Sequence, residues 1–286
     1  MIDRWLLFLL GLNLIHFAVA DSLGHICGGG NYTTNGTFHS NLNLLLASLS
    51  STSTTFFNDT KGSVPADLAY GLVLCRGDVT PSDCGTCIKN AAQDILSLCP
   101  KSKEATAWYD SCQLRYADID FFSVVDTNGS HIIVNVQNMT DPNTFIQWEK
   151  LLMETLSFQA AYTSSLLFAT GRLLITSDMS IYGLAQCTRD LSGVECSDCL
   201  QNIFIHYLKI TNGYQGGRVL SNSCNMRYEA RPFYQGNPSD FSITLPSQNS
   251  PPNFSTASPQ FPSSSPSKGD KFFMYIFLNL FIFCFW

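Results

Sequence analysis

The stretch A-Y-G-L-V-L-C at residues 69–75 decides the fold, because it returns as I-Y-G-L-A-Q-C at residues 181–187. The same displacement of 112 residues superposes three cysteines and one tyrosine of the first segment on the second: Cys84 on Cys196, Cys87 on Cys199, Cys112 on Cys224 and Tyr116 on Tyr228. Two such sets in one register are not expected by chance. The sequence therefore predicts a tandem duplication, with one copy over residues 21–125 and the other over residues 126–238.

The beginnings of the two copies also match, at a shorter displacement. Thr37-Phe38 corresponds to Thr144-Phe145, which lies 107 residues later. The second copy therefore carries five additional residues between its first helix and its next strand.

Each copy is predicted to contain two helices. Leucines at the spacing of an amphipathic helix mark the first one in copy one: Leu42, Leu45, Leu46 and Leu49. The second helix is expected to begin at Thr80, with Pro81 in its first turn and Asp83 closing a capping box. Ser192 and Glu195 repeat this arrangement in copy two.

Aromatic and branched residues predict strands around these helices. The predicted strands are Tyr70–Cys75, Ala105–Tyr116, Phe121–Val125, Tyr182–Cys187 and Arg218–Tyr228. Two helices packed against a small antiparallel sheet in each copy give an α+β fold.

Composition excludes several classes of protein. The 286 residues carry a net charge of −6, and 45% of them are hydrophobic, which is enough to build a core. An acidic chain with 16 Lys and Arg residues is a poor partner for phosphate backbones, so we do not expect nucleic-acid binding.

The N-terminus has the features of a secretory signal. Arg4 precedes an apolar run that ends in the cleavage motif Ala18-Val19-Ala20, so residues 1–20 are predicted to be a signal peptide. Export implies an oxidising compartment, where cysteines pair. It also makes the six N-x-S/T sequons candidate glycosylation sites: Asn31, Asn35, Asn58, Asn128, Asn138 and Asn253.

The C-terminal part changes in composition. Residues 239–271 are rich in Ser and Pro and are predicted to be a linker or stalk. Residues 272–286 form an apolar tail, which as a helix reaches only about 22 Å against a hydrocarbon core of roughly 30 Å. A glycolipid-anchor signal, a membrane span and a truncated span all remain open, and the tail is a candidate for membrane association.

Disulfides are the predicted role of the cysteines. Apart from Cys284 in the tail, copy one has six and copy two has four, and spacing alone leaves fifteen and three connectivities open. Copy two has Val134 in place of Cys27 and Thr211 in place of Cys99, and this double loss favours a Cys27–Cys99 bridge. For the remaining cysteines we favour four pairs: Cys75–Cys84, Cys87–Cys112, Cys187–Cys196 and Cys199–Cys224.

Two other interpretations of the C-x-x-C motif have less support. A zinc site needs two such motifs or a histidine pair within one fold, and each copy has one motif with no histidine pair at metal-ligand spacing. A thioredoxin-like redox site needs a parallel βαβ context and cysteines free to exchange. We therefore expect no metal and no cofactor.

The motifs together resemble a known plant family. C-x8-C-x2-C with its Y-G-L-x-x-C lead-in, G-G-R-V-L at residues 216–220 and C-N-M-R-Y-E at residues 224–229 resemble the ginkbilobin-type, or stress-antifungal, domain. The tandem form is similar to cysteine-rich repeat secretory proteins, to ectodomains of cysteine-rich receptor-like kinases and to plasmodesmata-located proteins. The resemblance covers about residues 25–238. It implies two helices on a five-stranded antiparallel sheet in each copy, and the bridges favoured above.

The resemblance also implies a carbohydrate site. The single-domain antifungal member binds mannose through an Asn after the first cysteine, an Arg six residues before the last cysteine and a Glu five residues after it. Copy two matches at Asn135, Arg218 and Glu229, whereas copy one has Gly28, Thr106 and Ala117. An amide, a guanidinium and a carboxylate suit sugar hydroxyls, which both donate and accept hydrogen bonds. The alternative is structural, with Arg218 and Glu229 forming an ion pair across neighbouring strands and Asn135 lying in a loop.

No catalytic residues are expected. The sequence has no G-x-S-x-G, no H-E-x-x-H, no phosphate-binding glycine loop and no kinase segment. The first functional hypothesis is a non-enzymatic extracellular module that binds mannose-containing glycans, or a receptor-like kinase or other ectodomain, in defence or stress response. The second hypothesis is a structural or adhesion protein at the cell surface or at cell junctions, which makes protein contacts without a small ligand.

Overall fold

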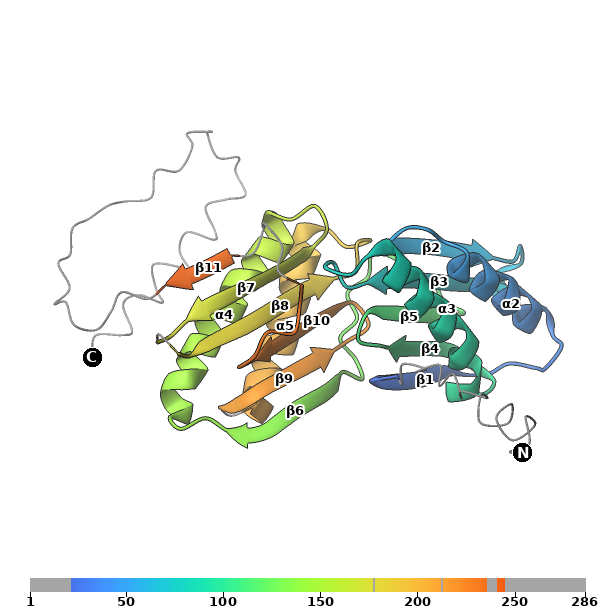
Figure 1. Cartoon of the computed structure of the whole chain (residues 1–286). Helices are drawn as coiled ribbons and strands as arrows, with labels where there is room; N and C mark the ends of the chain where they lie inside the picture. The colour runs from blue at the N-terminus through green and yellow to red at the C-terminus, as the bar shows by residue number, and fades with distance from the viewer. Residues whose placement is uncertain (1–21, 177, 212, 236–240, 245–286) are drawn as a thin grey trace, which may run out of the picture. The chain divides into compact units, whose positions relative to one another are not determined.

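The computed structural model describes residues 22–176, 178–211, 213–235 and 241–244. The predicted signal peptide, the apolar tail and the sequon at Asn253 lie outside these residues. In each copy of the repeat, two helices cover one face of a predominantly antiparallel sheet (Figure 1). The predicted α+β fold of two tandem, disulfide-linked domains is confirmed. Among the described residues, no helix combines the length and the apolar character that crossing a bilayer requires.

The first repeat forms a five-stranded sheet with the strand order β1-β4-β5-β3-β2, in which every neighbouring pair is antiparallel. Its elements are β1 Gly24–Asn31, α2 Thr37–Ser50, β2 Phe56–Lys61, the 3-10 helix η1 Pro65–Asp67, β3 Ala69–Cys75, α3 Pro81–Leu98, β4 Ser102–Trp108 and β5 Cys112–Ala117.

The second repeat has the same order of α-helices and strands followed by one additional strand, and its sheet has the strand order β11-β7-β8-β10-β9-β6. Its elements are β6 His131–Asn138, α4 Pro142–Tyr162, β7 Phe168–Leu174, β8 Ser180–Cys187, α5 Gly193–Thr211, β9 Tyr214–Leu220, β10 Cys224–Glu229 and β11 Phe241–Thr244.

Strand β11 corrects two expectations. The second sheet has six strands instead of five, and β11 lies within residues 239–271, which the composition had assigned to a linker. Strand β11 pairs in parallel with β7. Without it, β7 would be an edge strand with unpaired backbone groups, and such an edge accepts a short additional strand.

The glycine of the repeated Y-G-L motif has a packing role in both copies. A Cβ added at Gly71 on β3 would lie 2.8 Å from Cδ2 of Leu45 and 2.9 Å from Cδ1 of Leu49, both on α2. A Cβ at Gly183 on β8 would lie 2.6 Å from Cδ1 of Leu156 on α4. These distances are too short for carbon atoms, so the glycine allows the first helix of each repeat to approach its sheet closely.

The predicted starts of the second helices are confirmed. Thr80 Oγ1 accepts a hydrogen bond from the backbone N–H of Asp83 at 3.2 Å. In the second repeat the capping box is reciprocal, because the N–H of Ser192 donates to Glu195 Oε2 at 2.7 Å and the N–H of Glu195 donates to Ser192 Oγ at 3.3 Å.

Three strand predictions were wrong in extent or in type. Each of the segments Ala105–Tyr116 and Arg218–Tyr228 contains two strands joined by a short turn. Residues 121–125 form no strand, because Ser123 has a φ of 57° and its N–H donates to Asp190 Oδ2 at 2.7 Å. A contact with the second repeat therefore overrides the strand propensity of this segment.

The described residues form five disulfides, and they are the pairs favoured from the sequence: Cys27–Cys99, Cys75–Cys84, Cys87–Cys112, Cys187–Cys196 and Cys199–Cys224. In each repeat, two of the bridges join the second helix to two neighbouring interior strands of the sheet. The register places Val134 at the position equivalent to Cys27, because Val134 on β6 pairs with Gly217 just as Cys27 on β1 pairs with Ala105.

Candidate functional site

The three residues of the predicted sugar site lie on one face of the second sheet. Asn135 on β6 is paired with Gly216 on β9, and Gly216 is paired with Glu229 on β10. Arg218 lies two residues further along β9, on the same face, because side chains alternate along a strand. The neighbouring Val219 and Tyr228 point to the opposite face and belong to the helix-covered core. The structure therefore brings the three residues together on the face away from the helices.

This face borders a cavity of about 270 Å³, close to the smallest size typical of small-molecule sites. Asn135, Arg218 and Glu229 all line it, together with Ile133 and Arg227 of the second repeat. The first repeat contributes Leu23 and Asp110. The candidate site is therefore a pocket at the junction of the two repeats, which the three-residue motif alone did not predict.

Gly216 leaves the space that the Glu229 side chain occupies, since a Cβ at this position would overlap Oε2 of Glu229. The first repeat reverses the arrangement, with Glu104 at the position of Gly216 and Ala117 at the position of Glu229. Its Glu104 Oε1 accepts from Arg115 Nη2 at 3.3 Å.

Glu229 Oε1 accepts from Arg227 Nε at 3.1 Å, and Arg227 is the counterpart of Arg115. Both repeats therefore place one carboxylate beside the equivalent arginine. In the first repeat the carboxylate lies on the strand next to that of the arginine, and in the second repeat it lies on the same strand as the arginine. The first repeat still lacks equivalents of Asn135 and Arg218, because Gly28 and Thr106 hold those positions.

The ion pair proposed as the structural alternative, between Arg218 and Glu229, is not the one that forms. Arg218 Nη1 donates to Asp110 Oδ1 of the first repeat at 2.9 Å, whereas Glu229 pairs with Arg227. Asn135 lies in strand β6 instead of a loop, and its Oδ1 accepts from the N–H of Gln137 at 3.2 Å.

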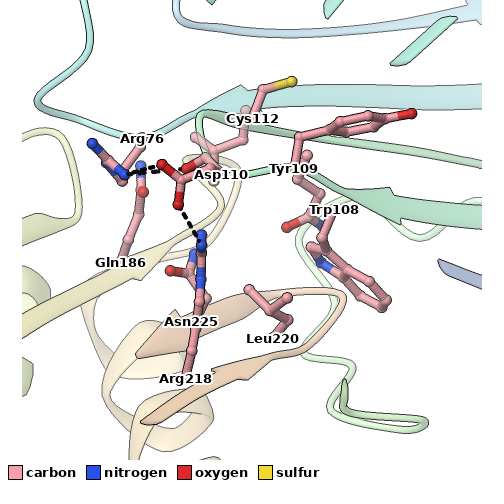
Figure 2. Close-up of a pocket in the computed structure, with 11 residues that line it drawn as sticks. Arg76, Trp108, Tyr109, Asp110, Cys112, Gln186, Arg218, Leu220 and Asn225 are labelled. Atoms are coloured by element: carbon pink, nitrogen blue, oxygen red, sulfur yellow. Dashed lines mark hydrogen bonds and ion pairs between the residues drawn. The ribbon is translucent and has the colours of Figure 1, made fainter. Parts of the chain in front are cut away.

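Three arginines surround Asp110. Besides Arg218, Arg76 Nη1 approaches Asp110 Oδ2 at 3.0 Å and Arg227 Nη1 approaches Oδ1 at 3.3 Å. Figure 2 shows Asp110 between Arg76, which directly follows β3 of the first repeat, and Arg218, which lies on β9 of the second repeat. A single carboxylate therefore joins cationic side chains of both repeats.

Burial and charge shift the pKa values of this cluster. Burial by itself would raise the pKa of Asp110, but the positive charges of Arg76, Arg218 and Arg227 outweigh it and lower that pKa below its ordinary value. Burial lowers the pKa of the Arg218 guanidinium to about 10, against the opposing effect of Asp110. Both groups are charged at neutral pH.

We expect the Asp110 carboxyl to titrate below the ordinary value of about 3.9. Because its pKa in the folded state is lowered, its contribution to stability is complete above the unfolded pKa and is lost as the pH falls through the folded pKa. A titration of the side-chain carboxyl ¹³C shift of Asp110 checks this expectation. A midpoint at or above about 4 would show that the three arginines do not act on this carboxylate.

Buried hydrogen bonds hold the two repeats together beside the pocket. Trp108 Nε1 donates to the carbonyl of Ser221 at 3.2 Å, and Gln113 Nε2 donates to the carbonyl of Asn222 at 2.7 Å. In the other direction, Gln186 Nε2 donates to the carbonyl of Cys75 at 2.9 Å. Each bond satisfies a polar side chain that is removed from water. The described part of the chain thus places the two repeats in direct contact.

Sequence reasoning missed the contribution of the first repeat to this site. Asp110 occupies a turn and has no motif around it, so its charge suggests only a solvated loop. Gln113 and Arg115 alternate with Leu114 and Tyr116 along β5, and this alternation predicts that the two polar side chains face solvent. Both side chains are in fact buried, and this burial, which only the three-dimensional structure shows, indicates their contact with the second repeat.

Most candidate glycosylation sites within the described residues are accessible. Asn31, Asn35, Asn128 and Asn138 are exposed, and Asn58 is half-buried. None of these five residues lines the pocket between the repeats.

Comparison with known proteins identifies relatives across both repeats. A family model described as salt stress response/antifungal matches residues 26–119 and 133–231. An antimicrobial ginkbilobin-2-like protein from Castanea crenata is 40% identical over 227 residues, which cover 79% of this chain and 94% of that protein. Cysteine-rich repeat secretory protein 38 from Arabidopsis thaliana is 38% identical over 216 residues, covering 74% of this chain and 85% of that protein.

Receptor-like proteins share the same region. Cysteine-rich receptor-like protein kinase 10 from Arabidopsis thaliana is 42% identical over 200 residues, which cover 68% of this chain but 29% of the kinase. The tandem DUF26 ectodomain of the cysteine-rich receptor-like protein PDLP5 from Arabidopsis thaliana has a TM-score of 0.63 and 26% identity, covering 74% of this chain and all of that one. The chain therefore belongs to the salt stress response/antifungal family of extracellular cysteine-rich proteins, as a tandem member with two matching domains.

Proposed function

We propose that this protein is a non-enzymatic extracellular binder of mannose-containing glycans in the defence or stress response of a plant, and that its second repeat carries the sugar site. The observation that supports the proposal is the convergence of Asn135, Arg218 and Glu229 on one pocket of about 270 Å³. The name of the antimicrobial ginkbilobin-2-like relative agrees with a defence role.

The chemistry of the pocket fits a neutral sugar. Asp110 and Glu229 supply two negative charges, Arg218 and Arg227 supply two positive charges, and the four lining side chains together are neutral. A neutral lining gives no net attraction to an acidic or a cationic ligand. The carboxylate oxygens accept hydrogen bonds from hydroxyl groups, and the Asn135 amide both donates and accepts. Ile133 and Leu23 add apolar surface for the C–H groups of a sugar ring.

Titration of the exported, disulfide-bonded protein with mannose tests the proposal, with amide NMR shifts as the readout. We expect saturable shifts around Asn135 and Glu229, and about a fivefold loss of affinity in Asn135→Ala, because a lost hydrogen bond contributes about 1 kcal/mol. Asn202→Ala is the matched control, since it removes an exposed amide of α5 that lies outside the pocket and in no sequon. The absence of any saturable shift near Asn135 would refute the proposal.

A further inference from the structure

In the ion pair between Asp110 and Arg218, the carboxylate of Asp110, which belongs to the first repeat, is the more accessible group. The side chain of Asp110 is 56% exposed, whereas that of Arg218 is 10% exposed. Arg218 Nη1 is already used in the bond to Asp110 Oδ1 at 2.9 Å. At this end of the pocket, the carboxylate of Asp110 is therefore better placed than the guanidinium of Arg218 to meet a ligand.

Arg227 aligns this carboxylate with that of Glu229. Its Nη1 lies 3.3 Å from Asp110 Oδ1 and its Nε lies 3.1 Å from Glu229 Oε1, so one planar guanidinium bridges two carboxylates from different repeats. The ring of Phe233 lies 4.2 Å from the Arg227 guanidinium carbon and supports it. The planar guanidinium therefore lies between the two carboxylates and contacts both.

Both carboxylates retain capacity to accept more hydrogen bonds. Each ionised carboxylate has about four acceptor positions. The contact described for Glu229 uses Oε1, and the three arginines use three acceptor positions of Asp110, two at Oδ1 and one at Oδ2. A ligand with two neighbouring hydroxyl groups can donate one hydrogen bond to each carboxylate, and neighbouring hydroxyls are the common feature of hexoses.

We propose that Asp110 of the first repeat is a ligand-binding residue of the sugar pocket and that Arg218 is a positioning residue, which holds Asp110 in place. This inference rests on the proposed function. It makes the pocket a composite site, in which one sugar contacts both repeats. The first repeat, whose own copy of the motif is incomplete, then takes part in binding through the turn between β4 and β5.

Mannose titration of the full protein and of Asp110→Asn tests this inference. We expect Asp110→Asn to lose about tenfold or more in affinity, because the ligand loses a hydrogen bond to a charged carboxylate and meets a neutral amide instead. Asp118→Asn is the matched control, since Asp118 also forms an ion pair in the first repeat, with Lys103 at 3.1 Å, and does not line the pocket. This control is expected to bind mannose as the unchanged protein does.

Two further variants keep the test decisive if Asp110→Asn proves poorly folded. Leu23→Trp adds bulk to the pocket from the first repeat without changing an ion pair, and we expect it to abolish binding. Arg218→Gln is expected to raise the pKa of Asp110 toward its ordinary value, a change that a purely structural role for Arg218 in the second sheet would not produce.

The outcomes separate this inference from the proposed function. If the unchanged protein shows no saturable mannose binding, the proposed function is wrong, and this inference is wrong with it. If the unchanged protein binds while Asp110→Asn and Leu23→Trp bind within twofold of it, the proposed function stands and the composite site is overturned.

Discussion

Replacing Trp108 by alanine is expected to lower the free energy of unfolding by about 3–5 kcal/mol, the range for truncating a large buried aromatic side chain. Trp108 is 1% exposed and lies at the end of β4, where its Nε1 donates to the carbonyl of Ser221 in the other repeat. The substitution therefore removes packing at the junction of the repeats and leaves a buried carbonyl without its donor. Chemical denaturation monitored by circular dichroism measures the loss.

Phe158→Ala is the control for this prediction. Phe158 is also a large aromatic residue, but it is 57% exposed on α4, so its truncation should change stability by only about 0.5 kcal/mol. If Trp108→Ala were as stable as Phe158→Ala, the junction between the repeats would not contribute to stability, and the pocket between them would lose its structural basis.

Removing the Cys199–Cys224 bridge, as Cys199→Ala with Cys224→Ala, is expected to lower the free energy of unfolding by about 3.5 kcal/mol. The bridge closes a loop with a sequence separation of 25 and joins α5 to β10 in the core of the second repeat. Its main effect is to restrict the unfolded chain, so the variant should unfold at a lower denaturant concentration. A loss below about 1 kcal/mol would contradict a structural role for this disulfide.

The Cys27–Cys99 bridge provides the comparison, because the second repeat folds without its equivalent. The variant Cys27→Val with Cys99→Thr reproduces the residues of the second repeat, and we expect it to remain folded although less stable. Its circular dichroism spectrum should match that of the unchanged protein, whereas loss of the folded spectrum would show that the two repeats depend on different bridges.

Local patterns predicted the elements of each repeat well. The leucine spacing, the caps at Thr80 and Ser192 and the glycine of the Y-G-L motif act within a few residues or against one neighbouring helix. The duplication added long-range information. The second copy lacks the counterparts of both Cys27 and Cys99, and this double loss correctly indicated a bridge between residues 72 positions apart. A repeated sequence can therefore reveal disulfide pairs that spacing alone leaves open.

Contacts between the repeats were not predictable in the same way. The segment of residues 121–125 has strong strand propensity, but its contact with Asp190 determines its conformation. Arg218 was identified from its motif, and its partner Asp110 was not, because the two residues are 108 positions apart and belong to different copies. The first repeat carries its carboxylate at Glu104 on β4, whereas the second carries it at Glu229 on β10. The strand pairing was needed to see that these two residues hold the same place beside an arginine.

A crystal structure of the exported protein with mannose, supported by a calorimetric titration, tests the central claim most directly. The account predicts a saturable interaction and one sugar in the pocket between the repeats, with hydroxyl groups within hydrogen-bonding distance of Asn135, Glu229 and Asp110. Saturable binding with the sugar located elsewhere on the protein, or no heat of binding at millimolar mannose together with an empty pocket, would contradict it.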